Sequence, residues 1–377
     1  MEPLPLNQVL CGDNREILPT LPCGSVDLCV TSPPYWGLRE YGHEDQLGLE
    51  AHPQLYVDHL VEICREVKRV IKPKGSFWLN LGDTYYGSNS GRGDGPNGKN
   101  YTSSLSMPET NVKNTYRSNW LQPKQLLGIP WRVATALQDD GWILRNCVIW
   151  FKPNHMPESV RDRLTKSYEF FFFFVKQRKY YFNLDAIRIP QQTKGDYADY
   201  SGKLELSERS KRPEVLTRDN LGKPNHKNGK NPGDTWQIGP NTGENNKTPY
   251  QTNNPHLQRI TKGLDDAKHE LGKNPGDIWE INTQPFPGSH FAVFPPELIE
   301  PIIKSSSPPN GIVLDPFAGS GTALRVARKL GRSFIGIELN PEYAEMCEQR
   351  VRADTYTKPP EGVPTLSSFS ITKRMEV

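Results

Sequence analysis

The chain has 377 residues, which at roughly 150 residues per domain predicts two or three folding units. Only 35% of the residues are hydrophobic and 31 Gly accompany 34 Pro, which disfavours a helical bundle, while 10% aromatic and 24% charged residues disfavour a disordered chain. The formal net charge of +3 is too small to indicate a nucleic-acid-binding protein by itself, so any basic surface must be local.

The first part of the chain alternates between predicted strands and helices. Residues 6–14 and 25–31 have the pattern of strands, and a short helix that ends near Leu21 separates them. Apolar residues at helical spacing predict a helix over 52–71 that ends at the KPKG sequence, and residues 75–83 form a further predicted strand. This alternation predicts a parallel sheet with crossover helices.

The middle of the chain changes in composition. From Tyr86 to Asn119 it is rich in Gly, Ser, Asn and Thr, which predicts a long mobile loop. Residues 128–142 then predict a helix and residues 143–153 a strand. The run Phe170–Val175 is apolar at every position, which is typical of a central strand in a sheet covered on both faces.

Residues 191–284 are mostly polar and too numerous for a structureless loop in a compact domain, so we expect a separate small domain, a partner-binding insertion, or both. Seven Lys and Arg against two acidic residues concentrate positive charge in Arg209–Lys230. GKNPGDTWQI at 229–238 recurs as GKNPGDIWEI at 272–281. Two copies are too few for a solenoid, which leaves a doubled turn-plus-strand unit or a duplicated contact element.

The sequence IVLDPFAGSGTALRVARKL predicts a strand, a Gly-bearing turn and a helix over 322–330, followed by a strand over 334–337. In nucleotide-binding units of this kind, an acidic residue about 20 positions later accepts hydrogen bonds from ribose. Glu338, 23 residues after Asp315, fits that position. A carboxylate before the glycines suits an ammonium group and repels a pyrophosphate, which favours S-adenosylmethionine over NAD or FAD. The alternative is a tight turn with a capping Asp.

A second motif, TSPPYW, follows the strand at 25–31. The consecutive Pro33 and Pro34 fix the backbone and remove two amide hydrogens, so the Ser32 hydroxyl and the Pro33 carbonyl are expected to face outward as acceptors for an exocyclic amino group. Tyr35 would stack on a planar ring. Accepting both amine hydrogens would direct the nitrogen lone pair toward an electrophile and stabilise positive charge during methyl transfer. The alternative is a Pro-rich turn with aromatic core packing.

SPPYW and DPFAGSGT resemble the catalytic and cofactor motifs of the DNA amino-methyltransferases, which methylate cytosine N4 or adenine N6. The catalytic motif precedes the cofactor motif, which resembles the permuted β group of that family. Further stretches similar to the family lie at 12–14, 152–183 and 274–303. The resemblance implies an α/β fold: a Rossmann-like, AdoMet-dependent methyltransferase sheet with permuted motif order and an inserted target-recognition region.

The same resemblance implies the domain organisation. The catalytic half of the core would span residues 1–190, with the mobile loop at 86–119. The target-recognition region would span 191–284, the cofactor-binding half of the core 285–354, and a frayed tail 355–377.

The resemblance also assigns roles at the cofactor site. Asp13 would lie near the adenine, Glu338 would hold the ribose and Asp315 the amino-acid end, while Phe294, just before a helix at Pro296, would help close the methionine pocket. A turn role for Asp13 and a core role for Phe294 are the alternatives. The complete expected set is Asp13, Phe294, Asp315, Phe317, Gly319, Gly321 and Glu338.

DNA contacts follow from the chemistry of such an enzyme. A base stacked in a duplex cannot reach the methyl group, so the target base must be extruded, with Tyr35 against its face. Basic side chains would contact phosphates, although solvated basic loops are an alternative. The residues expected to bind DNA are Lys152, Arg161, Arg163, Arg209, Lys211 and Arg212.

Many relatives that methylate adenine carry Asp where this chain has Ser32, and Ser is more typical of the cytosine-N4 enzymes. We therefore expect a site-specific, S-adenosylmethionine-dependent DNA (cytosine-N4) methyltransferase. An adenine-N6 enzyme on the same scaffold and a non-catalytic AdoMet- and DNA-binding specificity module remain alternatives. Double-stranded DNA is the expected partner, together with a cognate restriction endonuclease if the enzyme belongs to a restriction-modification pair.

Two further patterns bear on location and metals. The sequence has no 18-residue apolar window and no basic, apolar N-terminal segment, so neither a membrane span nor a signal peptide is indicated, and a cytoplasmic, DNA-associated protein is expected. The six cysteines form no CxxC pair, which disfavours structural zinc and a disulfide framework, and no metal is expected.

Overall fold

The computed structural model describes residues 3–38, 46–86, 121–158, 160–189, 274–284 and 294–353. It divides the chain into a larger unit of residues 1–154, 168–186 and 277–377 and a smaller unit of residues 155–167 and 187–276. Several sequence predictions lie outside the described residues: the loop over 86–119 apart from Tyr86, the basic residues Arg209, Lys211 and Arg212, the first copy of the repeat, and the tail.

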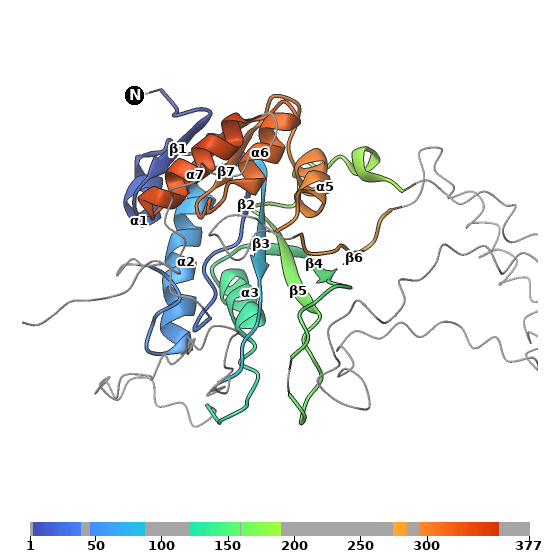
Figure 1. Ribbon diagram of the computed structural model, residues 1–377. Coiled ribbons are helices and arrows are strands. Elements are labelled where there is room, and N and C mark those ends of the chain that lie inside the picture. Colours follow the sequence, from blue (N-terminus) through green and yellow to red (C-terminus); the bar gives the residue numbers. More distant parts are fainter. Residues whose placement is uncertain are drawn as a thin grey trace, which may run out of the picture. The chain divides into compact units, whose positions relative to one another are not determined.

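The described part of the larger unit is built on an eight-stranded sheet with the order β1-β8-β7-β2-β3-β5-β4-β6 (Figure 1). The strands are β1 (Gln8–Cys11), β2 (Val26–Thr31), β3 (Ile71–Leu81), β4 (Ile143–Phe151), β5 (Tyr168–Val175), β6 (Ile278–Glu280), β7 (Ile312–Asp315) and β8 (Ser333–Glu338). The α-helices are α1 (Asn14–Ile17), α2 (Pro53–Val70), α3 (Ile129–Asp139), α5 (Pro296–Ser306), α6 (Thr322–Lys329) and α7 (Pro341–Arg352), with 3-10 helices at Leu18–Thr20 and Leu184–Ile187. None of these helices is long and apolar enough to cross a bilayer.

The sheet is mixed rather than wholly parallel. Strand β5 runs antiparallel to both of its neighbours, β3 and β4, whereas the other described strand pairs are parallel. The parallel pairing predicted from the first part of the chain is confirmed for β2 and β3, whereas the direction of β5 was not predicted. For β5 to run parallel to β4, the chain between them would need a crossover connection, which is usually helical. The described residues between Phe151 and Tyr168 contain no helix.

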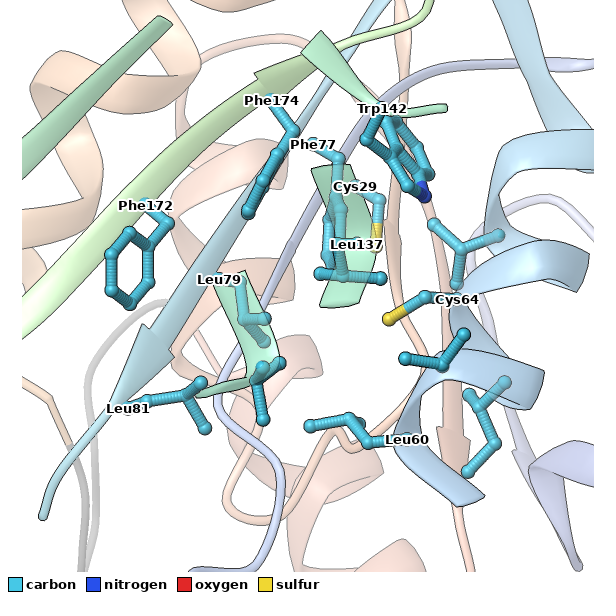
Figure 2. Close-up of a cluster of buried hydrophobic side chains, with 14 of the residues drawn as sticks. Cys29, Leu60, Cys64, Phe77, Leu79, Leu81, Leu137, Trp142, Phe172 and Phe174 are labelled. Atoms are coloured by element: carbon cyan, nitrogen blue, oxygen red, sulfur yellow. The ribbon is translucent and has the colours of Figure 1, made fainter. Parts of the chain in front are cut away.

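The aromatic run of β5 is covered on both faces, as its sequence predicted. Phe172 and Phe174 belong to the core cluster that contains α2 and α3, whereas Phe171 and Phe173 belong to the cluster that contains α5 and α6. Figure 2 shows the first of these clusters, in which Phe77 lies between Phe174 and the ring of Trp142. Because side chains alternate across a strand, this pattern requires helices on both faces of the sheet, and the fold is a Rossmann-like α/β sheet.

The end of α2 differs from its prediction. The helix ends at Val70 and β3 begins at the next residue, so the KPKG sequence lies inside the strand. The register between β2 and β3 shifts between Val26 and Leu28 of β2, because the KPKG segment of β3 forms a bulge there. A Cβ atom on Gly75 would come within 2.6 Å of the Asp27 carbonyl oxygen, so glycine allows the two backbones to approach.

Strands β2 and β7 are neighbours in the middle of the sheet and run parallel, with Cys29 opposite Leu314. Their carboxyl ends therefore meet at the same edge, and the turns that follow them start side by side. In open α/β sheets, ligands bind outside the carboxyl ends of the strands. The sheet order thus brings together the two sequence motifs that carry the predicted chemistry.

The second copy of the repeat is described in part. Gly276 takes a φ of +79°, and its amide donates to the Asn274 Oδ1 atom over 3.0 Å. Strand β6 follows and pairs with β4 at the end of the sheet. In the described residues this copy is a turn followed by a strand.

Candidate active site

A cavity of about 240 Å³ lies at the carboxyl ends of four parallel strands of the larger unit. The turns after β1, β2, β7 and β8 all contribute to its wall. The lining includes residues 12–15, 32–35, 315–320 and 338–340, together with Glu169 and Phe294. All four predicted catalytic residues, Ser32, Pro33, Pro34 and Tyr35, therefore share one cavity with most of the predicted cofactor residues.

A direct hydrogen bond joins the two motifs. Thr31 Oγ1 donates to Asp315 Oδ1 over 2.5 Å, and the Phe317 amide donates to the same oxygen over 3.1 Å. Asp315 is only 2% exposed and forms no ion pair with a Lys or Arg of the described residues. Burial and, to a lesser extent, the charge of Glu338 raise the pKa of Asp315 to about 7 against the lowering effect of the two hydrogen bonds. A buried carboxyl group without a cationic partner on a cavity wall suits an ammonium ligand.

Glu338 is held at the end of β8 by backbone amides. The Gly319 amide donates to Oε2 over 2.7 Å and the Asn340 amide donates to Oε1 over 3.0 Å. Burial raises the pKa of Glu338 above its ordinary value, although these hydrogen bonds act in the opposite direction. Each carboxylate oxygen retains a lone pair, so the fixed carboxylate has the acceptors that a pair of ribose hydroxyls requires.

The glycines of the turn after β7 have different surroundings. Gly319 lines the cavity and takes a φ of +51°. Gly321, with a φ of +74°, precedes α6 and faces α7, where an added Cβ would lie 2.5 Å from Cys347 Sγ. Gly321 is not among the described residues that line the cavity, so its geometry indicates close helix packing rather than ligand contact.

Two aromatic residues predicted at the cofactor site, Phe294 and Phe317, line the cavity. Phe294 is 9% exposed and its ring centroid lies 6.4 Å from that of Phe171. It therefore combines the core and pocket positions that the sequence left as alternatives.

Asp13 also lines the cavity, and it caps α1 by accepting from the Arg15 amide over 2.8 Å. The Arg15 guanidinium pairs with the same carboxylate. The neighbouring Asn14 was not predicted as a site residue, yet it is buried and its Nδ2 donates to the Pro316 carbonyl over 3.0 Å. This bond fixes α1 against the turn after β7.

The SPPY turn is held by hydrogen bonds that its sequence alone did not indicate. Tyr56 on α2 donates its hydroxyl to the Pro34 carbonyl over 2.9 Å. Ser32 Oγ donates to the Tyr35 hydroxyl over 3.3 Å. Among the described residues, no hydrogen bond reaches the Pro33 carbonyl, in keeping with its predicted role as an acceptor for an amine.

The Tyr35 side chain is held by its hydroxyl group. Its hydroxyl lies 2.9 Å from Asn80 Oδ1 and 2.9 Å from Glu169 Oε2. A Cβ atom on Gly82 would lie 2.6 Å from the Tyr35 Cε2 atom, so the absence of a side chain there leaves room for the ring. Burial, with the charge of Glu169, raises the pKa of Tyr35 well above its usual value, so the phenol keeps its proton.

Glu169 near the start of β5 is the main site residue that sequence reasoning missed. Its Oε1 atom pairs with the Lys152 ammonium, which also lies 4.2 Å from the centroid of the Trp150 ring. Burial raises the pKa of Glu169, but Lys152 and the hydrogen bonds from Tyr35 and Asn80 outweigh it and bring the pKa below its ordinary value. The Lys152 side chain is 17% exposed, and its observed partner is Glu169. Its contact with a DNA phosphate stays a prediction.

The predicted DNA-binding residues Arg161 and Arg163 belong to the smaller unit. Arg161 is exposed, whereas Arg163 pairs with Glu158 and donates to the Leu164 carbonyl over 3.0 Å. Their contact with phosphates stays a prediction.

Sequence comparison identifies relatives over most of the chain. A family model described as DNA methylase, N6_N4_Mtase, matches residues 26–349. Type II methyltransferase M.XycI of Xanthomonas campestris pv. cyanopsidis is 38% identical over 342 residues, which cover 90% of this chain and 86% of that protein. Type II methyltransferase M.Cfr9I of Citrobacter freundii is 36% identical over 356 residues, which cover 94% and 91%.

Structural comparison agrees with the fold. The PvuII DNA methyltransferase, described as cytosine-N4-specific, superposes with a TM-score of 0.53 at 17% identity, covering 93% of this chain and 88% of that one. At this identity the likeness concerns the fold.

Proposed function

This chain belongs to the N6/N4 DNA methylase family, and on that premise we propose that it methylates the exocyclic N4 of cytosine in duplex DNA. It is a DNA methyltransferase whose methyl donor is S-adenosyl-L-methionine. The observation that supports this reaction most directly is the shared cavity of Ser32, Asp315 and Glu338. A target amine beside Ser32 and a cofactor at the carboxyl ends of β7 and β8 would lie in the same cavity.

The residues of the cavity divide between two tasks. Asp315 would bind the ammonium of the cofactor and Glu338 its ribose, while Asp13, Phe294 and Phe317 would line its remaining surface. When bound, the cofactor supplies an electrophilic methyl group. Gly319 and Gly321 would shape the turn that receives it.

On the substrate side, Ser32 and the Pro33 carbonyl would accept the two hydrogens of the flipped amine, and Tyr35 would stack on the base. The Ser32 hydroxyl already directs its hydrogen to Tyr35, which leaves its lone pairs for the amine. Two points support cytosine as the target: Ser rather than Asp begins this motif, and the PvuII enzyme, which shares the fold, is named cytosine-N4-specific.

The DNA contacts are part of the same proposal. Basic side chains would position the duplex through its phosphates, and the region 191–284 would read base edges. Because several relatives are named Type II methyltransferases, a cognate restriction endonuclease is the proposed partner. The proposed phosphate-binding residues are Lys152, Arg161, Arg163, Arg209, Lys211 and Arg212.

The choice of base is tested with S-adenosylmethionine labelled in its methyl group. After incubation with duplex DNA and digestion to nucleosides, the label is expected in N4-methyldeoxycytidine. Label in N6-methyldeoxyadenosine would contradict the proposal and assign the adenine alternative. Unlabelled RNA added as a competitor should not reduce the incorporation of label into DNA. If the chain binds the cofactor but transfers no label to DNA of any sequence, a non-catalytic module is favoured.

Cofactor affinity is expected to depend on pH through Asp315. With a pKa of about 7 in the free protein, its carboxyl must lose a proton to pair with an ammonium. Affinity should therefore rise as pH increases from 5 to 7, by up to about tenfold per unit, and fall again once the cofactor's amino group deprotonates above about pH 8. Calorimetric titrations across this range measure it, and buffers of different ionisation enthalpy report the proton released near pH 7.

Asp315→Asn serves as the control for this pH dependence. The amide cannot ionise, so its weaker binding should be flat between pH 5 and 7. An acid limb that persists in Asp315→Asn, or constant wild-type affinity over that range, would contradict the assignment.

A further inference from the structure

The cavity wall contains a directed chain of hydrogen bonds that cofactor binding and base stacking do not require. Ser32 Oγ donates to the Tyr35 hydroxyl over 3.3 Å, and the Tyr35 hydroxyl lies 2.9 Å from both Glu169 Oε2 and Asn80 Oδ1. Of these two acceptors, the carboxylate is the one that is basic enough to take up a proton. Each hydroxyl in this chain can accept one proton and pass on another. The chain starts at the group proposed to hold the amine and ends on a carboxylate.

Methyl transfer to an exocyclic amine requires a proton acceptor. As the nitrogen forms its bond to the methyl carbon, the carbon–sulfur bond breaks, its electron pair stays on sulfur, and the nitrogen gains a positive charge. A neutral methylated amine forms only when one N–H proton leaves the nitrogen. A protein group within hydrogen-bond reach of the nitrogen can take that proton as it is released.

We propose that Glu169 is the terminal acceptor of this proton, which reaches it through Ser32 and Tyr35. The amine proton passes to Ser32 Oγ, the Ser32 hydrogen passes to the Tyr35 oxygen, and the Tyr35 hydrogen passes to Glu169 Oε2. The net result is a neutral methylamine and a protonated Glu169, with both hydroxyls restored. This inference rests on the proposed function.

The surroundings of Glu169 fit an acceptor. The charged group that faces it among the described residues is Lys152, at the end of β4; Tyr35 faces it from the turn after β2, and the neutral Asn80 from β3. The Lys152 ammonium, together with hydrogen bonds, keeps the pKa of Glu169 below its ordinary value despite burial, so the carboxylate is charged when the amine arrives. Such a weak base suffices because a methylated aromatic ammonium is a far stronger acid than a carboxylic acid.

Tyr35 is suited to transmit the proton. Burial and the nearby Glu169 charge raise its pKa well above the usual value, so a phenolate is not a stable resting state. The Tyr35 hydrogen therefore moves to the carboxylate only as a proton from Ser32 arrives on the Tyr35 oxygen.

The test uses single-turnover methyl transfer from a preformed complex of the full chain with cofactor and duplex DNA. Glu169→Gln keeps the size of the side chain and is expected to slow transfer by about 100-fold, within the range for loss of a general base, with cofactor and DNA affinities within twofold. Tyr35→Phe, which keeps the ring, should lose a similar factor. Because both belong to one chain, the double variant should lose little more than either single variant.

A matched control comes from α5. Glu300 pairs with Lys304 over 2.7 Å and does not line the cavity among the described residues, so Glu300→Gln removes the same charge from a Lys–Glu pair elsewhere. It should transfer at the wild-type rate. If Glu169→Gln folds poorly because Lys152 is left without its partner, Lys152→Met/Glu169→Gln removes both charges and should fold while still transferring slowly.

The pH profile separates proton transfer from a positioning role. In Lys152→Met, burial acts on Glu169 without the ammonium, so its pKa should rise and an acid limb should enter the rate profile at higher pH than in the wild type. Raising the pH should recover the lost rate. If Glu169 only positioned Tyr35, the rate of the Lys152→Met variant would be lowered by the same factor at every pH.

Three results would overturn the relay: Glu169→Gln within twofold of the wild-type rate, multiplicative losses in the Tyr35→Phe/Glu169→Gln variant, or a Lys152→Met rate that does not recover at high pH. Transfer is scored as total methyl incorporated into DNA. Label on adenine would therefore refute the proposed base while leaving the relay test valid, since either amine must release the same proton.

Discussion

Asp315→Ala is expected to reduce the affinity for S-adenosylmethionine by about 100- to 4,000-fold, the factor that corresponds to losing one member of a buried ion pair at about 3 to 5 kcal/mol. The carboxyl group is 2% exposed on the cavity wall, so solvent would not screen its interaction with an ammonium. Equilibrium dialysis or calorimetry with the purified chain measures the loss. Methylation should fall with it at subsaturating cofactor.

The fold should survive the change. Burial without a cationic partner is what raises the pKa of Asp315 to about 7, so removing the carboxyl group also removes that cost. Thr31 and the Phe317 amide lose an acceptor in Asp315→Ala, which Asp315→Asn retains in part. Both variants should unfold cooperatively near the wild-type temperature. Unchanged cofactor affinity in Asp315→Ala would refute its role.

Tyr35→Ala is expected to leave cofactor affinity within about twofold and to reduce methyl transfer by about 1,000-fold or more. The loss combines base stacking, worth about 1 to 3 kcal/mol, with the loss of the hydroxyl. Tyr35 follows β2, whereas Asp315 and Glu338 are the last residues of β7 and β8, so cofactor binding is not expected to depend on the ring. Single-turnover rates and binding isotherms measure the two effects separately.

Comparison of Tyr35→Ala with Tyr35→Phe divides that loss. The phenylalanine ring still stacks, so the difference between the two variants reports stacking, and the remaining loss in Tyr35→Phe reports the hydroxyl. A methylation rate that is intact in Tyr35→Ala would show that this ring has no part in holding the base.

The fold of the proposed cofactor-binding half could be predicted from the sequence because its elements are local. Strand β7, helix α6 and strand β8 begin and end within one or two residues of their predicted bounds, and Glu338 comes at the end of the last strand as predicted. Hydrophobic periodicity and glycine placement determine such a unit within about thirty residues of chain.

The polar network could not be predicted because it depends on strand register. Glu169 and Asn80 lie on adjacent strands that run antiparallel, and the sequence predicted neither the direction nor the register of residues 168–175. Lys152 was interpreted from its charge alone as a phosphate ligand, whereas its carboxylate partner becomes visible only when β4 and β5 are paired. The same holds for Thr31, whose partner Asp315 is 284 positions away.

The order of the strands has a consequence for the evolution of target choice. Strand β6, the first strand described after residues 190–273, pairs among the described residues with β4 at the sheet margin, and three strands separate it from β2. Insertions, deletions or exchange of that segment between related enzymes therefore leave the alignment of β2 with β7 untouched. On the proposed role of residues 191–284 in reading base edges, recombination there would supply new DNA targets without a change in the turns that carry the chemistry.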